Sequence, residues 1–182
     1  LSRGEFVALM GMLMATIALS IDTMLPALGM IATDLSPRDA NRAQLVITSF
    51  VLGMGLGTFF AGPLADRFGR KPVLVAGSVL FVLSSLAAYL ANSLEILLVA
   101  RVIQGIGASG PRVIVTTVVR DLYHGREMAK MTSLVMIVFT LVPAIAPSLG
   151  AAILNFAGWR DIFAVFVVFS FISATWFLVR LP

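Results

Sequence analysis

Three charged side chains fall inside long apolar stretches of this sequence, where an isolated charge is costly. Asp22 comes sixteen uncharged residues after Glu5, and Arg101 and Arg112 interrupt a later apolar run. A charge at the centre of a membrane costs about 3 kcal/mol or more, and such residues usually have a partner or a function. Asp22 is therefore a candidate proton carrier. The alternative is that its side chain reaches the nearby outer membrane surface.

Arg101 and Gln104 are three residues apart, so they share one face of a helix. Arg112 lies eleven residues after Arg101, close to three helical turns, and is expected on the same face. The three side chains are candidates for the polar lining of a cavity within the membrane. The alternatives are an outer-interface arginine at position 101 and an arginine that extends to the inner surface at position 112.

The composition explains why these charges stand out. Of the 182 residues, 59% are apolar and 12% are charged, and the mean hydropathy is +1.02. A soluble domain of this size cannot bury so much apolar surface, which favours a polytopic membrane protein. There is no cysteine and one histidine, His124, so neither a metal site nor a catalytic nucleophile–base pair is expected. We therefore expect no cofactor and no enzyme activity, and we attribute the net charge of +4 to loops facing anionic lipid, not to nucleic-acid binding.

Six apolar stretches are long enough to cross a bilayer as helices, which takes about 20 residues. The expected spans are approximately 6–31, 43–65, 73–91, 94–119, 131–157 and 162–179. We therefore predict an all-α membrane protein in which residues 1–182 form one six-helix transmembrane domain.

The short connection at residues 62–72 sets the expected orientation. It places Asp66, Arg67, Arg70 and Lys71 at one membrane face, and the basic excess predicts that this face is cytoplasmic. With six spans, both termini are then cytoplasmic as well. The expected inner face carries eight basic residues and the outer face three: Arg3, Arg67, Arg70, Lys71, Arg120, Arg126, Lys130 and Arg180 inside, and Arg38, Arg42 and Arg160 outside.

A weak internal echo indicates a repeat. Gly62 precedes Phe68 by six residues, Gly150 precedes Phe156 by six, and each phenylalanine begins a short turn that contains glycine and arginine. The two turns fall on opposite membrane faces, as two three-helix units of inverted topology would place them.

The stretch Gly62-Pro63-Leu64-Ala65-Asp66-Arg67-Phe68-Gly69-Arg70-Lys71 resembles the signature loop of the major facilitator superfamily, G-x-L-a-D-r-x-G-r-k. The resemblance implies the N-terminal six-helix half of such a transporter. It also implies an inner gate in which Asp121 pairs with Arg70 or Arg67, while Asp66 faces a helix N-terminus in the other half. The signature loop and inner gate then comprise Gly62, Asp66, Arg67, Gly69, Arg70, Lys71 and Asp121.

Two further stretches resemble motifs of proton-coupled members of the superfamily. Residues 101–108 resemble the fourth-helix motif R-x-x-q-G-x-g-a, which implies that Arg101 lines the central cavity and influences the protonation of Asp22. Pro143, Pro147 and Gly150 resemble the fifth-helix motif of drug–proton antiporters, centred on G-P-x-x-G-G, although alanines replace two of its glycines.

Residues 21–28 and 119–123 look most like the bicyclomycin/chloramphenicol-resistance (Bcr/CflA) branch. The resemblance implies a multidrug efflux protein of the bacterial inner membrane, which exchanges protons for small, partly apolar compounds by alternating access and so supports antibiotic resistance. The expected partners are protons, a small-molecule substrate, the lipid bilayer, and a C-terminal six-helix half or a second copy of the chain. A proton-coupled metabolite importer and a non-transporting half-domain remain alternatives. Candidate side chains for an adaptable apolar pocket, each of which could instead face core or lipid, are Met24, Phe50, Met54 and Phe139.

Overall fold

The computed structural model describes residues 2–181, and this part of the chain is built from helices without any strand. Six segments are long and apolar enough to cross a membrane, which confirms the predicted all-α membrane fold. The elements in chain order are α1 (Arg3–Asp22), η1 (Leu25–Ala27), α2 (Leu28–Leu35), η2 (Ala40–Gln44), α3 (Leu45–Phe68), α4 (Arg70–Tyr89), α5 (Leu94–Leu122), α6 (Gly125–Phe156) and α7 (Arg160–Arg180). The first membrane segment joins α1, η1 and α2, and the second joins η2 and α3.

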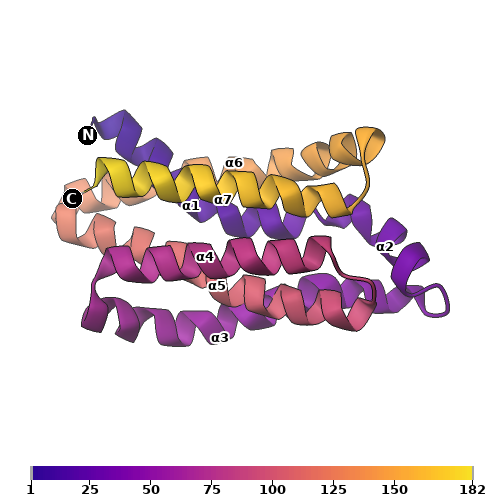
Figure 1. The fold of residues 1–182 in the computed structure, drawn as a ribbon. Coiled ribbons are helices and arrows are strands. Elements are labelled where there is room, and N and C mark those ends of the chain that lie inside the picture. Colours follow the sequence, from indigo (N-terminus) through magenta and orange to yellow (C-terminus); the bar gives the residue numbers. More distant parts are fainter. Residues whose placement is uncertain (1, 182) are drawn as a thin grey trace.

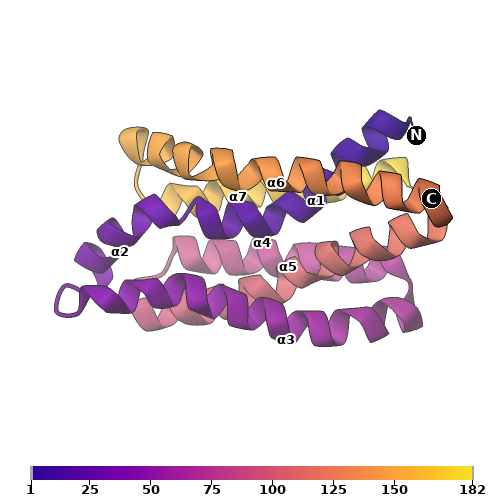
Figure 2. The same ribbon diagram turned by 180° about the vertical axis from the view of Figure 1, so that it is seen from behind.

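The long helices lie roughly parallel or antiparallel in two groups, α1, α6 and α7 in one and α3, α4 and α5 in the other (Figures 1 and 2). The start of α1 and the end of α7 lie at the same end of this bundle, together with the α3–α4 and α5–α6 connections (Figure 1). We call this the loop-69 end, after Gly69 between α3 and α4. Gly69 has a φ of 90°, a left-handed conformation that favours glycine, and it lets the chain reverse within one residue.

The contacts between helices have the two-fold pattern of an inverted repeat. In such a repeat α1 corresponds to α5, α3 to α6, and α4 to α7. The α1–α6 contact then has its counterpart in the α3–α5 contact, and the α1–α7 contact in the α4–α5 contact; all four contacts exist. The α1–α5 and α4–α7 contacts map onto themselves. Helices α1 and α5 run in opposite directions along the bundle (Figure 1). The predicted pair of three-helix units is therefore present, interleaved across the two groups.

Glycines set the spacing between the central helix α5 and its neighbours. A side chain at Gly53 of α3 would overlap the Val102 carbonyl, and one at Gly105 of α5 would meet the backbone of α3. A Cβ at Gly107 of α5 would lie 2.7 Å from the carbonyl oxygen of Gly77 in α4. Since lipid tails are as apolar as side chains, such close backbone packing is what holds membrane helices together.

Side chains near both ends of the bundle tie elements that are distant in sequence. At the loop-69 end, the Glu5 carboxylate accepts hydrogen bonds from Arg180 at 2.6 and 2.8 Å and from the Trp176 indole at 3.2 Å. At the opposite end, the Trp159 indole donates to Asp34 at 2.8 Å. These contacts join α1 to α7, and α2 to the start of α7.

The six segments are buried to very different extents inside this chain. Each segment contains an apolar stretch of 18 residues. In α5, 67% of this stretch is buried, compared with 11% in α6 and 28% in the segment that contains α3. Helix α5 is therefore the centre of the bundle. Helices α3 and α6 present most of their apolar side chains outward, to lipid or to further protein.

We predict that Gly53→Ala lowers the stability of the purified chain, because the new methyl group meets the α5 backbone, which cannot move aside as a side chain can. Overpacking of this kind costs about 1–3 kcal/mol. Thermal unfolding in detergent micelles measures it. The matched control is Gly55→Ala, two residues along the same helix, where a Cβ meets nothing within 4 Å. Equal melting temperatures for the two variants would contradict the proposed role of glycine in the α3–α5 contact.

Candidate site at Arg101 and the break in the first helix

The helix of the first membrane segment is interrupted directly after Asp22. Helix α1 ends at Asp22, and the chain tightens into the 3-10 turn η1, which contains Pro26, before α2 begins. The amide of Met24 donates to the Ile21 carbonyl at 3.3 Å, three residues back, in place of the four-residue spacing of an α-helix. The break leaves Asp22 half-buried, and it forms no ion pair among residues 2–181.

Arg101 lies at the centre of the bundle and has no exposed surface. Its Nε donates to the Val46 carbonyl of α3 at 3.0 Å, and its Nη2 donates to the Ser20 carbonyl of α1 at 2.9 Å. Its Nη1 donates to Gln104 Oε1 at 2.7 Å, one turn along α5. Hydrogen bonds to a charged group contribute about 1.5–3 kcal/mol each, so this fork of donors is a strong link among three helices.

Gln104 extends the network to a fourth helix. Its Nε2 donates to Ser85 Oγ of α4 at 2.7 Å, and the Ser85 hydroxyl donates to the carbonyl of Phe81 at 2.7 Å. The Arg101 guanidinium also lies over the Phe50 ring, 4.6 Å from its centroid, and an aromatic face attracts a cation. The buried charge is thus dispersed over carbonyls, an amide and an aromatic ring, and no carboxylate of residues 2–181 is among its hydrogen-bond partners.

Arg101 forms no ion pair or hydrogen bond with Asp22 in this structure. Arg101 contacts the carbonyl of Ser20, two residues before Asp22. Nor does Arg101 line an open cavity, because α1, α3 and its own Gln104 enclose it. Any influence of Arg101 on Asp22 acts without an ion pair between them, through the position of α1 or through the field of the buried charge.

Arg112 does not share the burial of Arg101, although both lie on α5 at the expected spacing. Arg112 is exposed, whereas Arg101 is completely enclosed, because neighbouring helices cover this face of α5 at one level and not at the other. Gln104 is enclosed with Arg101, whereas the exposure of Arg112 is compatible both with the lining of a cavity and with a side chain that extends to the inner surface.

Three of the four candidate pocket side chains, Met24, Phe50 and Met54, lie in or against one hydrophobic cluster, and Phe139 does not. Met24 and Phe50 are fully buried in the hydrophobic core, so they line no open pocket here. Met54 and Phe139 are half-buried, on α3 and α6. Core packing, the alternative considered for each residue, describes Met24 and Phe50.

The loop-69 end brings the signature-loop charges together. Arg70 at the start of α4 forms an ion pair with Asp121 near the end of α5, and both side chains are partly exposed. Arg67 lies over the Phe68 ring, 5.1 Å from its centroid. Asp66 is exposed and Lys71 is half-buried. Gly62 has open space where a Cβ would point, so nothing within the described residues fills that position.

The proline-containing part of α6 contacts the break in the first segment. Helix α6 continues through Pro143, which is exposed, and Pro147, which is half-buried. Gly150 is buried, and a Cβ there would meet the Thr23 carbonyl and lie 3.0 Å from Pro26 Cγ. The fifth-helix motif and the break beside Asp22 are therefore one packed unit.

Two polar residues that the sequence did not single out belong to this region. Ser85 receives the Gln104 amide, and the Thr23 hydroxyl is buried without a hydrogen-bond partner among the described residues. A signal for Ser85 was available, since two adjacent serines inside an apolar run require internal partners. Thr23 directly follows Asp22, but its unsatisfied hydroxyl depends on how α6 packs.

Comparisons with known proteins agree with this architecture. The family model described as Major Facilitator Superfamily matches residues 4–182. An uncharacterized MFS-type transporter, YdgK, of Bacillus subtilis is 38% identical over 175 residues, 95% of this chain and 43% of that protein. A chloramphenicol resistance protein of Pseudomonas aeruginosa is 37% identical over 148 residues, 81% of this chain and 35% of that protein. A bicyclomycin resistance protein homolog of Haemophilus influenzae is 32% identical over 177 residues, 97% of this chain and 44% of that protein.

Among solved structures, the inward-open xylose transporter XylE of Escherichia coli matches with a TM-score of 0.82 and 18% identity. The match covers 100% of this chain and 48% of that one, and at this identity it shows the fold alone. The chain thus spans about half the length of the relatives that it matches.

We predict that Arg101→Lys destabilises the chain by about 2 kcal/mol or more, because a compact ammonium cannot serve three acceptors placed for a planar fork. Unfolding of the purified chain in micelles measures the change. Arg112→Lys, on an exposed position of the same helix, should stay within about 0.5 kcal/mol. An Arg101→Lys variant as stable as Arg112→Lys would show that the buried fork does not hold the helices.

Proposed function

The chain belongs to the Major Facilitator Superfamily, and from that premise we propose that it is the N-terminal half of a proton-coupled exporter of small, partly apolar compounds. The observation that carries the proposal is its 37% identity, over 81% of its length, to a protein named for chloramphenicol resistance. Relatives named for bicyclomycin resistance and multidrug resistance give it further support.

Asp22 is the proposed proton carrier. It lies half-buried at the end of α1, where Pro26 and the 3-10 turn permit a change of direction, and no basic group of the described residues pairs with it. The free energy of placing a carboxyl in hydrocarbon is far lower when it is protonated than when it is charged. The protonated form of Asp22 is therefore favoured in apolar surroundings and the charged form in hydrated surroundings. The break gives α1 the freedom to exchange these surroundings.

Arg101 is a positioning residue in this proposal. Its hydrogen bond to the Ser20 carbonyl fixes α1 against α3 and α5 immediately before the break. The part of the segment beyond Asp22 rests instead on Gly150 of α6. A movement of α6 during alternating access would therefore shift the chain beyond Asp22 while Arg101 holds the part before it.

The Arg70–Asp121 ion pair is the proposed latch at the loop-69 end. It joins the start of α4 to the end of α5, and its partial exposure allows it to open and close. The proposed location is the inner membrane of a bacterial cell, with this end and both termini in the cytoplasm, and the excess of basic residues at this end supports that orientation.

Completion of the transport path requires more helices than this chain contains. The outward apolar faces of α3 and α6 are the proposed contacts for a C-terminal six-helix half or for a second copy of the chain. The mass of the purified chain in nanodiscs, corrected for lipid, separates the two, since a mass of two chains indicates self-pairing.

Two other functions are separated by measurement of flux. A proton-coupled importer would move its substrate inward under a proton gradient directed into the cell. A half-domain that only assists assembly would bind substrate without vectorial transport. Net outward movement of a labelled compound would exclude both alternatives and support the exporter.

We predict that Asp22→Asn abolishes proton-driven efflux in the transporter that contains this chain, because asparagine keeps the shape but cannot carry a proton. Counterflow exchange of substrate without a pH gradient should persist. Substrate uptake into inverted vesicles measures both, because movement out of the cell corresponds to movement into an inverted vesicle. The control is Asp39→Asn, an exposed loop carboxylate that caps the following turn, a contact which the amide preserves. Undiminished efflux in Asp22→Asn would remove this residue from proton coupling.

We also predict that Arg70→Gln and Asp121→Asn each cost less than about 1 kcal/mol of stability, since the ion pair is partly exposed. Both variants should nevertheless reduce transport strongly, because the proposed latch acts on one conformation. The charge swap, Arg70→Asp with Asp121→Arg, should recover part of the lost transport. A swap no better than either single variant would argue against a latch.

A further inference from the structure

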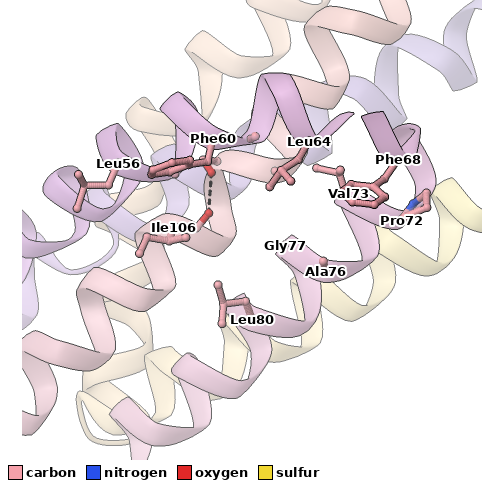
Figure 3. A pocket seen from close by; sticks show the side chains of 14 residues that line it. Leu56, Phe60, Leu64, Phe68, Pro72, Val73, Ala76, Gly77, Leu80 and Ile106 are labelled. Atoms are coloured by element: carbon pink, nitrogen blue, oxygen red, sulfur yellow. Dashed lines mark hydrogen bonds between the residues drawn. The ribbon is translucent and has the colours of Figure 1, made fainter. Parts of the chain in front are cut away.

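A cleft opens sideways between α3 and α4 on the half of the bundle near the loop-69 end (Figure 3). Both helices pack extensively on α5 and only sparingly on each other, so they diverge over an α5 floor. The cavity between them has a volume of about 510 Å³. It is lined by Leu56, Gly57, Phe60, Ala61, Leu64, Phe68, Pro72, Val73, Ala76, Gly77, Leu80, Ile106, Ser109 and Gly110.

The lining offers no free hydrogen-bonding side chain. Its single hydroxyl, that of Ser109, donates to the Ile106 carbonyl of its own helix at 2.6 Å (Figure 3). The remaining lining side chains are hydrocarbon, and Phe60 and Leu64 are exposed at its edge. An occupant of this cleft must therefore be apolar along its whole buried length.

The length of the cleft corresponds to one membrane leaflet. Leu56 and Phe68 line it on α3, and twelve helical residues span about 18 Å. Half of the roughly 30 Å hydrocarbon core is about 15 Å, the depth that the acyl chains of one leaflet occupy. The cleft begins beside Phe68 and Pro72, next to the loop, and ends near the middle of the bundle.

A cation lies at the loop end of the cleft. Arg67 is exposed and rests over the ring of Phe68, which itself lines the cleft. Arg70 is engaged by Asp121, whereas Arg67 forms no ion pair among residues 2–181. Asp66, the acidic neighbour, and Lys71, half-buried on the following helix, are the other charges of the loop. Basic groups beside intramembrane pockets bind the headgroups of anionic lipids.

From these features we infer that the cleft is a binding site for an anionic phospholipid of the leaflet next to the loop-69 end. One acyl chain lies between α3 and α4, and the headgroup phosphate binds Arg67. Packing against both helices favours the bound acyl chain over a free one, because hydrocarbon contact replaces poorly filled space. The inference does not depend on the direction or the substrate of transport.

The other exposed side of α3 is distinct from this cleft. Leu52, Phe59 and Asp66 follow one another along the helix on a strip about a third of a turn around α3 from the one that carries Phe60 and Leu64. A second half or a second copy can cover the first strip and leave the cleft open to lipid. Phe59 is the more exposed of the two adjacent phenylalanines, 76% against 59%, as expected for a strip that lacks its cover.

Native mass spectrometry of the chain, purified from vesicles of phosphatidylcholine with a minor share of phosphatidylglycerol, tests the inference. The wild-type chain should retain phosphatidylglycerol in preference to phosphatidylcholine. Ala76→Phe places a ring in the cleft and should abolish retention, whereas Val79→Phe, exposed on α4 outside the lining, should not. Helical circular dichroism and melting temperature verify that both variants fold.

The headgroup contact has its own matched pair of variants. Arg67→Gln should weaken retention of phosphatidylglycerol about fivefold, the equivalent of about 1 kcal/mol for one basic residue near the membrane surface. Arg126→Gln, an exposed arginine at the same end of the bundle but outside the lining, should have little effect. Equal retention of the two lipids, or lipid retention unchanged in folded Ala76→Phe, would overturn the inference. Occupation of the cleft by a transported compound or by a helix of another chain, with no retained lipid, would overturn it as well.

Discussion

The fold depends on the enclosure of one guanidinium. Arg101 cannot reach water, and no carboxylate in the described part of the chain accepts a hydrogen bond from it. Its charge is therefore stable only while carbonyls of α1 and α3 and the Gln104 amide surround it. Displacing any one of these helices would leave a charge in hydrocarbon with unfilled donors, which costs several kcal/mol. The guanidinium therefore specifies how α1, α3 and α5 meet, and through Ser85 it includes α4 as well.

The glycines make this enclosure geometrically possible. Because Gly53 and Gly105 bring the backbones of α3 and α5 together, a carbonyl of α3 comes within reach of Arg101 on the neighbouring helix. The same close contacts pull α3 and α4 onto α5 and so away from each other. The lateral cleft beside Phe60 and Leu64 is a consequence of this arrangement, which closes the centre of the bundle and leaves its flank unfilled.

The charged residues consequently fall into two classes with different physical roles. Arg101 is immobilised by at least three strong hydrogen bonds, which suits the positioning of a helix. Asp22 lies at a break with few constraints, which suits a group that changes its surroundings. Arg70 and Asp121 form an intermediate case, since their ion pair is well formed but remains open to solvent. A rigid centre with adjustable groups at its margins is what a protein requires if it moves as a body around a substrate path.

The number of membrane helices, the loop at Gly69 and the inverted repeat could all be predicted from the sequence. The length of apolar stretches, the position of glycines and the excess of charge are local properties of the sequence. In a membrane they predict structure directly, because an apolar stretch that crosses the bilayer must form a helix. The burial of the charged side chains could not be predicted in this way. Arg101 and Arg112 have the same residue type on one helix face, yet one is enclosed and the other exposed, because that difference depends on which other helices cross at each level. Helical spacing determines which residues share a face. Only the packing of distant segments decides what that face contacts. For this reason the sequence could not show that Arg101 binds the carbonyl of Ser20 and not the carboxylate of Asp22.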